Sequence, residues 1–433
     1  MQMQPTLSRR TFNLVLGAIL VLALAIRVFT AFEVRSIVPQ SDAADFDRHA
    51  ISLADGHGYP APLEVLGGGD ATAFRPPLYP FALAAVYLGI DTHDESARWL
   101  AGRLEQALIG TVVVALIGLI ALQLWGRRPA LIAAAIAAVY PPLILAGTSL
   151  LTEPLFTALL LAGVAALLRF RASQHYVGWL VAAGVCAGLA SLTRGNGIAI
   201  ILIFAFGAWV LRPRWSWRAA AAPAILVACA AVVVAPWTVR NAVELKAFVP
   251  VTDQTGIAIG GQYNDLAKAT DWSWVGPWLV PEFKSLYAGK PLGEVELGRK
   301  LTNRGVNYAT DHPGAVVSVA FNNTLRLFSL KDPVEFERTS ASFVGEPQGL
   351  AQASVYSFWA LALIAIAGAF SPLARRLPGF VWAIVPLLGV SIIFVAGSGR
   401  YRAPLEPVFV LLAAAAIEWA LSSRDRWRPS SRS

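Results

Sequence analysis

The sequence predicts an all-α protein that crosses a membrane many times. Of its 433 residues, 56% are hydrophobic and 14% are charged, and the mean hydropathy is +0.57. A soluble domain has about 25% charged residues, so this composition excludes a soluble protein. The apolar residues are gathered in long runs, as transmembrane helices require. The two cysteines, Cys186 and Cys229, both lie in such runs, so we expect neither a disulfide framework nor a zinc site.

About ten stretches of the chain are apolar enough to be transmembrane helices. Several are shorter than the roughly 20 residues that a helix perpendicular to the bilayer needs, so their ends are expected only to within a few residues. The first stretch has no clear small-residue cleavage site, and we expect a retained helix rather than a signal peptide. The stretches are 12–32, 100–125, 129–147, 153–169, 177–193, 196–212, 219–237, 353–370, 379–397 and 403–421.

Arginines set the expected orientation. If the N-terminus is cytoplasmic, the basic clusters all fall on the cytoplasmic side, where Lys and Arg accumulate, and an even number of spans returns the C-terminus to that side. The formal net charge of +8 is therefore a topology signal, and no nucleic-acid partner is expected. The clusters comprise Arg9, Arg10, Arg127, Arg128, Arg169, Arg171, Arg212, Arg214, Arg218, Arg375, Arg376 and the tail from 424 to 432.

Two apolar stretches are expected to lie at the outer membrane surface instead of crossing it. The run at 77–90 is short for a span, and a crossing there would move every later arginine cluster outside. The stretch 315–330 is interpreted in the same way because it carries Asn322, Asn323 and Arg326.

Two large extracytoplasmic loops follow from this topology. The first covers 33–98, and the second covers 238–352. The second loop is rich in tryptophan, which is typical of the membrane–water interface. We find no internal repeat and no separate soluble domain, so 1–433 is expected to be one transmembrane domain.

Charged residues stand at the outer ends of several expected spans. Charges near hydrocarbon are costly, rare and usually functional. Each of these residues is placed by its own part of the topology, yet all converge on the outer face. They are Asp42, Asp45, Arg75, Glu153, Arg194, Arg400 and Arg402.

Each charge also has a simpler interpretation. Asp42 or Asp45 is a candidate general base, or a helix-start aspartate. Arg75 is able to grip a phosphate with two donors, or it extends to lipid headgroups. Glu153 at a helix start is favoured by the helix dipole. Arg402 is spaced to form an i,i+4 pair with Glu406.

The ordered set of motifs resembles the GT-C superfamily of integral membrane glycosyltransferases. The closest likeness is to the bacterial branch of glycosyltransferase family 39, near the protein O-mannosyltransferases and aminoarabinose transferases. The likeness covers nearly the whole chain. It is carried by Asp42 after the first span, by Arg75-Pro76-Pro77-Leu78, by Glu153, and by Arg400-Tyr401 followed by Pro404.

The resemblance implies a GT-C-type helical bundle with interfacial helices in its long outer loops. It also implies a sugar donor carried on a polyprenyl phosphate, and inversion at the anomeric carbon. Asp42 matches the catalytic aspartate, because Phe46 supplies the aromatic residue four positions later. Many relatives have a glutamate next to this aspartate. Ala43 stands there instead, so Asp45 stays open as the base.

The resemblance assigns the other charged residues as well. Glu153 matches a second acidic position that orients the acceptor or supports the base. The donor phosphate is expected to meet a set of basic and tyrosine side chains. No cofactor or metal is expected, although the family divides on a divalent metal. The expected phosphate-binding set is Arg75, Arg194, Arg400, Tyr401 and Arg402.

We expect further substrate contacts from His57 and Tyr59 in the first outer loop and from Trp272 and Trp274 in the second. The expected location is the bacterial cytoplasmic membrane, with both termini cytoplasmic and the active site extracytoplasmic. The partners are a polyprenyl-phosphate sugar, membrane lipids, and an acceptor that is a glycan, a lipid or a protein.

Three alternatives are weighed against this hypothesis. A transporter or lipid flippase predicts charges at mid-membrane depth, broken helices and inverted repeats. A GT-C member that uses a lipid-linked oligosaccharide as donor has the same motifs. A non-catalytic lipid-glycan binder is disfavoured because Asp42, Arg75 and Glu153 occur together.

Overall fold

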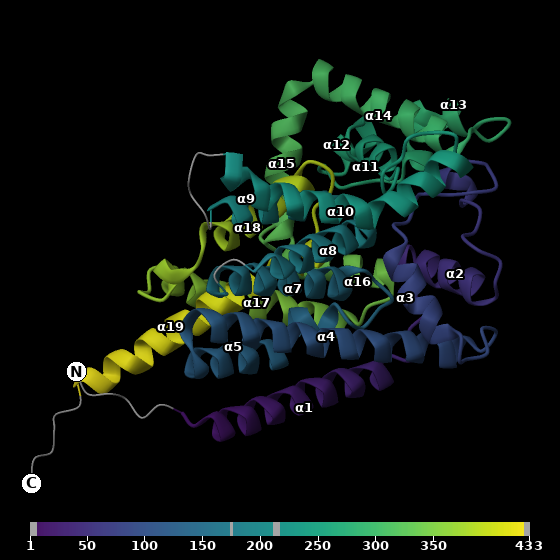
Figure 1. The fold of residues 1–433 in the computed structure, drawn as a ribbon. Helices are drawn as coiled ribbons and strands as arrows, with labels where there is room; N and C mark the ends of the chain where they lie inside the picture. The colour runs from purple at the N-terminus through teal and green to yellow at the C-terminus, as the bar shows by residue number, and fades with distance from the viewer. Residues whose placement is uncertain (1–6, 174–175, 211–216, 428–433) are drawn as a thin grey trace, which may run out of the picture.

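The computed structural model describes residues 7–173, 176–210 and 217–427, and the regular elements in these ranges are helices. Gly68 and Gly293 form an isolated β-bridge. The long helices run along a common direction and form a bundle (Figure 1). The expected all-α polytopic fold class is confirmed.

The bundle contains a helix for every expected span. Six of its helices are long and apolar enough to cross a membrane: α1 (Arg9–Glu33), α4 (Glu95–Trp125), α7 (Glu153–Ala172), α10 (Trp217–Glu244), α17 (Gln348–Ala369) and α19 (Glu406–Trp427). Shorter helices complete the set: α5 (Arg127–Val139), α8 (Val177–Thr193), α9 (Ile198–Val210) and α18 (Gly379–Ile393).

One expected span is broken. Instead of one helix over 129–147, α5 ends at Val139 and a short α6 (Pro141–Leu145) follows. The cause is Pro141, because a proline disfavours helical backbone at the residue before it. At the break, Arg27 of α1 donates hydrogen bonds to the carbonyl oxygens of Ala137 and Ala138 at 3.2 and 3.1 Å.

Small residues let the bundle helices pack closely. A Cβ atom on Gly368 of α17 would lie 1.9 Å from the carbonyl oxygen of Leu412 in α19. Ala130, Ala133 and Ala134 of α5 are fully buried in the same core. Close packing of this kind holds membrane helices together in the absence of a hydrophobic driving force between them.

One end of the bundle carries basic residues. Arg127 donates to the carbonyl oxygen of Leu7 at 2.5 Å, and Arg128 pairs with Glu418 at 3.8 Å. The start of α1 and the end of α19 lie at this end, on the left of Figure 1. Arg212, Arg214 and 428–433 lie outside the described residues. That this end faces the cytoplasm stays a prediction.

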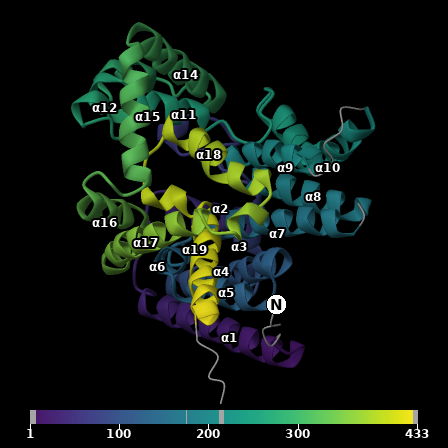
Figure 2. The same cartoon turned by 90° about the vertical axis from the view of Figure 1, so that its left-hand side faces the viewer.

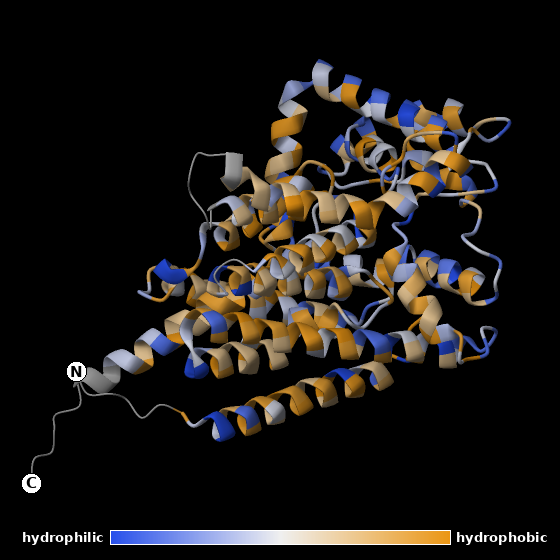
Figure 3. Ribbon diagram, viewed as in Figure 1, coloured by the Kyte–Doolittle hydropathy of each residue, from blue (hydrophilic) through white to orange (hydrophobic). Residues whose placement is uncertain are grey.

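Shorter helices form both expected outer loops. The first loop forms α2 (Asp42–Ala54) and α3 (Leu78–Tyr87). The second forms α11 (Thr255–Gln262), α12 (Asp265–Ala269), α13 (Lys284–Tyr287), α14 (Glu294–Asp311), α15 (Pro313–Leu327) and α16 (Pro333–Val344). Figure 2 shows α11, α12, α14 and α15 gathered together, and Figure 3 shows that α2 and α14 are more hydrophilic than the bundle.

The two stretches expected to lie at the membrane surface are α3 and α15. They have 10 and 15 residues, fewer than the roughly 20 that a helix perpendicular to the bilayer needs. The two loops also pack on each other, because Leu66 and Phe74 of the first loop join Ile257 and Leu297 of the second in one apolar cluster. The loops therefore form one structure above the bundle end.

Candidate active site

Asp42 is held between two arginines at the start of α2. Its Oδ1 accepts a hydrogen bond from Nη2 of Arg75 at 2.9 Å, and its Oδ2 accepts one from Nη2 of Arg400 at 2.7 Å. Arg75 precedes Pro76 in the first loop, and Arg400 lies in the 3₁₀ turn η6 (Gly399–Arg402) before α19. Three segments far apart in the sequence therefore meet at one carboxylate.

Asp45 extends this network on one side. Its Oδ2 accepts a hydrogen bond from Nε of Arg75 at 2.7 Å, and its Oδ1 pairs with Nη2 of Arg48 at 3.0 Å. The ring of His49 lies beneath it, with Nδ1 3.4 Å from Oδ1 of Asp45. Asp42 and Asp45 thus share one arginine, because residues three apart in a helix lie on the same face.

Glu153 extends the network on the other side. Its Oε1 is 2.7 Å from Nε of Arg400 and 2.7 Å from Nη1 of Arg194. The ring of Tyr401 lies against both guanidinium groups, 5.1 and 5.4 Å from their central carbons. Acids and bases alternate through the whole set, which we call the charge chain: Arg48, Asp45, Arg75, Asp42, Arg400, Glu153 and Arg194.

Exposure distinguishes the three carboxylates of the charge chain. The side chain of Asp42 is 28% exposed, whereas those of Asp45 and Glu153 are 2% and 1% exposed. A general base has to come within hydrogen-bond reach of the group that it deprotonates. Asp42 is therefore the most accessible of the three carboxylates, and its role as the base stays a prediction.

The arginines also control how strongly Asp42 and Asp45 bind protons. Burial raises the pKa of Asp42, but the charges and hydrogen bonds of Arg75 and Arg400 outweigh it and hold the pKa well below the usual range. Burial likewise opposes ionisation of Asp45, whose pKa is lowered by its contacts with His49 and Arg75. In this arrangement both aspartates are ionised and weakly basic.

Arg400 is positioned by a residue that the sequence analysis missed. Oε1 of Glu337 in α16 accepts a hydrogen bond from the backbone N–H of Gly399 at 2.8 Å. A Cβ atom on Gly399 would lie 2.3 Å from the same oxygen, so a larger residue there would displace the carboxylate of Glu337. In the sequence, Glu337 is an acidic residue beside the apolar residues of α16. This pattern is common in helices of outer loops, so it does not indicate the role of Glu337.

Arg402 lies apart from the charge chain. Its Nε donates to Glu406 at 2.5 Å, and its Nη1 donates to the carbonyl oxygen of Leu327 at 2.7 Å. The i,i+4 pair that the spacing allowed is therefore present, and it is buried. Tyr140 donates a further hydrogen bond to Glu406 at 2.7 Å. The expected grouping of Arg402 with Arg400 at a phosphate is corrected by this placement.

The four residues expected to contact substrate lie in two different places in the structure. The hydroxyl of Tyr59 donates to the carbonyl oxygen of Arg75 at 2.6 Å, beside the charge chain, and His57 is exposed nearby in sequence. Trp272 and Trp274 instead pack within the second loop, where Trp274 donates to the carbonyl oxygen of Ile257 at 3.3 Å. The structure does not bring these tryptophans to the charge chain.

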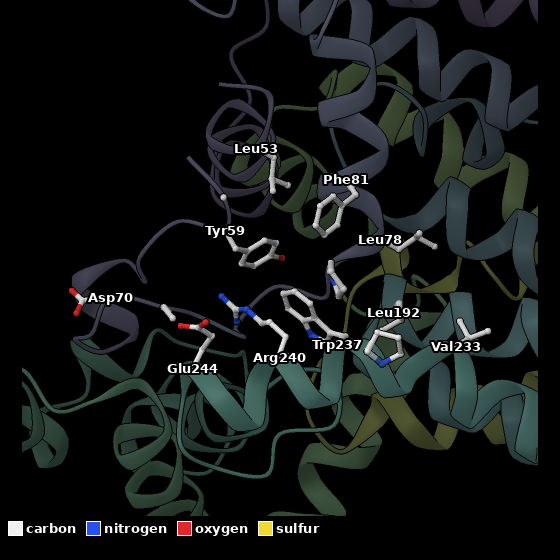
Figure 4. Close-up of a pocket in the computed structure, with 14 residues that line it drawn as sticks. Leu53, Tyr59, Asp70, Leu78, Phe81, Leu192, Val233, Trp237, Arg240 and Glu244 are labelled. Atoms are coloured by element: carbon white, nitrogen blue, oxygen red, sulfur yellow. The ribbon is translucent and has the colours of Figure 1, made fainter. Parts of the chain in front are cut away.

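A cavity of about 690 Å³ lies on the other side of Tyr59 (Figure 4). One part of its wall is apolar and comes from α3, α8 and α10. The other part carries Asp70, Arg240 and Glu244. The apolar wall includes Leu78, Phe81, Leu192, Val233 and Trp237.

Arg240 is the second residue that the sequence analysis missed. Its Nη1 donates to the carbonyl oxygen of Thr72 at 2.7 Å, and its guanidinium lies 4.8 and 5.5 Å from the ring centres of Trp237 and Tyr59. Among the described residues it forms no ion pair, unlike Arg75, Arg194 and Arg400. In the sequence, Arg240 could have been recognised as an arginine one helical turn after a tryptophan, at the expected outer end of a span.

The charge chain does not fit a divalent metal. Within the described ranges, no three His, Cys, Asp or Glu side chains are grouped so that they could hold an ion. Arg400 donates to Asp42 and to Glu153, and so fills the position between these two carboxylates. We therefore derive no step through a metal.

A sequence comparison identifies the family to which part of the chain is similar. Residues 80–249 match the model of the dolichyl-phosphate-mannose-protein mannosyltransferases. This stretch runs from α3 to the connection after α10. No curated protein matches the sequence as a whole or in part.

Solved structures resemble the whole chain. The oligosaccharyltransferase of Archaeoglobus fulgidus, tethered to an acceptor peptide, matches 97% of the chain with 14% identity and a TM-score of 0.60. The same archaeal enzyme, AglB, in complex with an inhibitory peptide and a dolichol-phosphate matches 98% with 15% identity and a TM-score of 0.58. The chain spans about half the length of these structures, 51% and 52%.

ArnT from Cupriavidus metallidurans, bound to undecaprenyl phosphate, matches 94% of the chain and 79% of its own length with 15% identity and a TM-score of 0.44. The expected resemblance to the GT-C membrane glycosyltransferases is confirmed: the chain has the fold of the archaeal oligosaccharyltransferase, and its residues 80–249 are similar to the dolichyl-phosphate-mannose-protein mannosyltransferases.

Proposed function

We propose that the protein transfers a sugar from a polyprenyl-phosphate carrier to an acceptor hydroxyl at the extracytoplasmic face of a bacterial cytoplasmic membrane. The observation that carries this proposal is the partly exposed Asp42, fixed between Arg75 and Arg400. A cavity lined by Tyr59 and by Arg240, which forms no ion pair among the described residues, accompanies it. The matched mannosyltransferase model and the archaeal fold support it.

The cavity suits an isoprenoid lipid with an anionic head. Its apolar wall, with Leu78, Phe81 and Val233, is a surface for the hydrocarbon chain. Arg240 stands at the polar end and has donors that no carboxylate occupies. Guanidinium groups bind phosphate with paired hydrogen bonds. The phosphate would then lie beside Tyr59, with Arg75 behind it.

Transfer requires one bond to form as another breaks. The acceptor oxygen attacks the anomeric carbon while Asp42 takes the hydroxyl proton, and the bond between that carbon and the phosphate oxygen breaks. The electron pair stays on the lipid phosphate, which leaves from the opposite face, so the configuration inverts. In this proposal Arg75 and Arg400 stabilise the charge that grows on the leaving group.

Donor binding also prepares the base. The phosphodiester of the donor, a monoanion, competes with Asp42 for Arg75 and Arg400, the two groups that depress the pKa of Asp42. As their hold weakens, the pKa of Asp42 rises toward its ordinary value and the carboxylate becomes a better proton acceptor. Asp45 and Glu153 keep the two arginines in place while this exchange occurs.

Arg240→Gln is expected to raise the KM for the donor by about 10- to 100-fold, since a charged hydrogen bond to the phosphate is worth about 1.5–3 kcal/mol. The rate at saturating donor should change little, because Arg240 does not contact Asp42. Arg299→Gln, an exposed arginine on α14, is the matched control. An unchanged KM in Arg240→Gln would remove the cavity from the donor site.

The proposal is tested with the purified protein in lipid nanodiscs and a panel of radiolabelled polyprenyl-monophosphate sugars and polyprenyl-diphosphate oligosaccharides. We expect transfer from one of the monophosphate donors. Transfer from an oligosaccharide donor alone would support the oligosaccharide alternative. Lipid or solute movement in liposomes, without transfer from any donor, would support the transporter alternative.

A further inference from the structure

The second outer loop holds the backbone that leads to Arg75. The N–H of Gly68 donates to the carbonyl oxygen of Leu292 at 2.7 Å, and the N–H of Glu294 donates to that of Gly68 at 3.3 Å. Gly67 has a φ of 124°, and a Cβ atom there would lie 2.5 Å from Cα of Glu294. The two loops are therefore joined closely at this point.

The side chain of Glu294 continues this attachment toward Arg75. Its Oε1 accepts the N–H of Ala73 at 2.7 Å, and its Oε2 accepts the hydroxyl of Thr72. Oγ1 of Thr72 in turn accepts the N–H of Phe74 at 2.9 Å. Glu294 is only 4% exposed. One buried carboxylate thus fixes the three residues before Arg75.

Asp253 and Glu294 form a neighbouring pair of buried carboxyl groups. Both oxygens of Asp253 are buried, and no N–H or O–H donor of the described residues reaches them. Two carboxylates without a proton only accept hydrogen bonds, so this contact needs one proton between them. Burial, and then the charge of Glu294, raise the pKa of Asp253 to about 8, and the pKa of Glu294 is also raised.

The other charged and titratable groups near the pair come from two elements. Arg240 of α10 attracts Glu294 and is itself attracted by Glu244. Tyr59 of the first loop lies within the field of Glu294. A single arginine, shared with Glu244, does not neutralise two buried carboxylates, which favours retention of the proton.

We propose that Asp253 and Glu294 share one proton and act together as positioning residues that hold Arg75 in place for the donor phosphate. The part that concerns the donor rests on the proposed function. The shared proton itself does not, because it is a property of the folded chain.

The expected pH dependence follows from the raised pKa. Between pH of about 4 and 8 the folded chain retains a proton on Asp253 that the unfolded chain has lost. The free energy of unfolding therefore falls as the pH rises through this window. Above pH 8 the protonated fraction falls about tenfold per pH unit, and transfer should fall with it.

Asp253→Asn is the decisive variant, because an amide keeps the size of the carboxyl group and donates permanently to Glu294. We expect a melting temperature in detergent that depends less on pH from 4 to 8 than that of the wild type, and transfer that persists at pH 9. Glu296→Gln, an exposed neighbour on α14 that pairs with Lys300 at 2.9 Å, is the control and should behave as wild type.

Glu294→Ala tests the positioning role. It is expected to lower kcat/KM by about 100-fold at every pH, since a displaced catalytic group costs roughly this much. Glu294→Gln should recover most of the loss, because it still accepts from Ala73. Recovery by glutamine separates a lost hydrogen bond from a general loss of folding.

The two proposals fail in different ways. If Asp253→Asn shows the same pH dependence as wild type, both in melting temperature and in transfer, the shared proton is wrong. If the wild type shows no transfer at any pH, the proposed function is wrong, and the melting temperatures alone still decide whether the proton is shared.

Discussion

Asp42→Asn is expected to lower the rate of sugar transfer by about 10²- to 10⁴-fold, the usual contribution of a general base. Asparagine keeps the size of the side chain and accepts a hydrogen bond from one arginine, but it cannot take the proton of the acceptor. The binding of donor should survive, because Arg75 and Arg240 remain. The loss is therefore expected in kcat rather than in the KM for the donor.

Single-turnover transfer from the donor that the wild type uses measures this effect. Asp55→Asn, an exposed residue at the end of the same helix, should transfer at the wild-type rate. If Asp42→Asn stays active and Asp45→Asn does not, Asp45 is the base, and the greater exposure of Asp42 does not identify the base.

Arg400→Met is expected to abolish transfer and to destabilise the protein by about 3–5 kcal/mol, the cost of breaking a buried ion pair. The substitution leaves Glu153, whose side chain is 1% exposed, with Arg194 as its remaining partner in the charge chain. It also frees one oxygen of Asp42 and removes a cation from the leaving group. Both the free energy of unfolding and the rate of sugar transfer should therefore fall.

Thermal unfolding in detergent and transfer assays separate these two effects. Adding Glu153→Gln to Arg400→Met removes the uncompensated charge, so stability should recover in part while transfer stays absent. Arg48→Met is the matched control, because its side chain is 33% exposed and pairs only at the edge of the charge chain. An Arg400→Met protein as stable as wild type would contradict the coupling of Arg400 to Glu153.

The helices were predictable because hydrocarbon imposes a simple requirement on sequence. A stretch that crosses a bilayer has to be apolar along about 20 residues, whatever its neighbours are. The break at Tyr140 was visible as Pro141 but was overlooked, because the apolar run continues through it. The hydropathy of a segment shows that its surroundings are apolar, but it does not show whether the helix is continuous.

The members of the charge chain other than Arg48 were predicted from the sequence, but their pairing was not. Charged side chains near hydrocarbon are energetically costly and rare, so each of these residues could be recognised by itself. Arg400 and Arg402 are two residues apart, yet one reaches Glu153 and the other Glu406. The direction of each side chain depends on a 3₁₀ turn held by Glu337, which the spacing of the motif does not contain.

Residues that act through loop contacts were missed for a related reason. Arg240, Asp253 and Glu294 owe their positions to the packing of one outer loop on another. Thr72 and Glu294 are 222 residues apart in the sequence. Partners so distant leave no local pattern of spacing or periodicity that a single sequence would show.

The ion pair between Asp42 and Arg400 joins residues that are 358 positions apart. During synthesis Asp42 leaves the ribosome long before Arg400, and the helix that follows Arg400 is the last one of the described chain. The charge chain is therefore completed only after every helix between Asp42 and Arg400 has been made. Under the proposed function, a chain that stops short of Arg400 has the carboxylate without one of the arginines that orient it, so it would transfer no sugar.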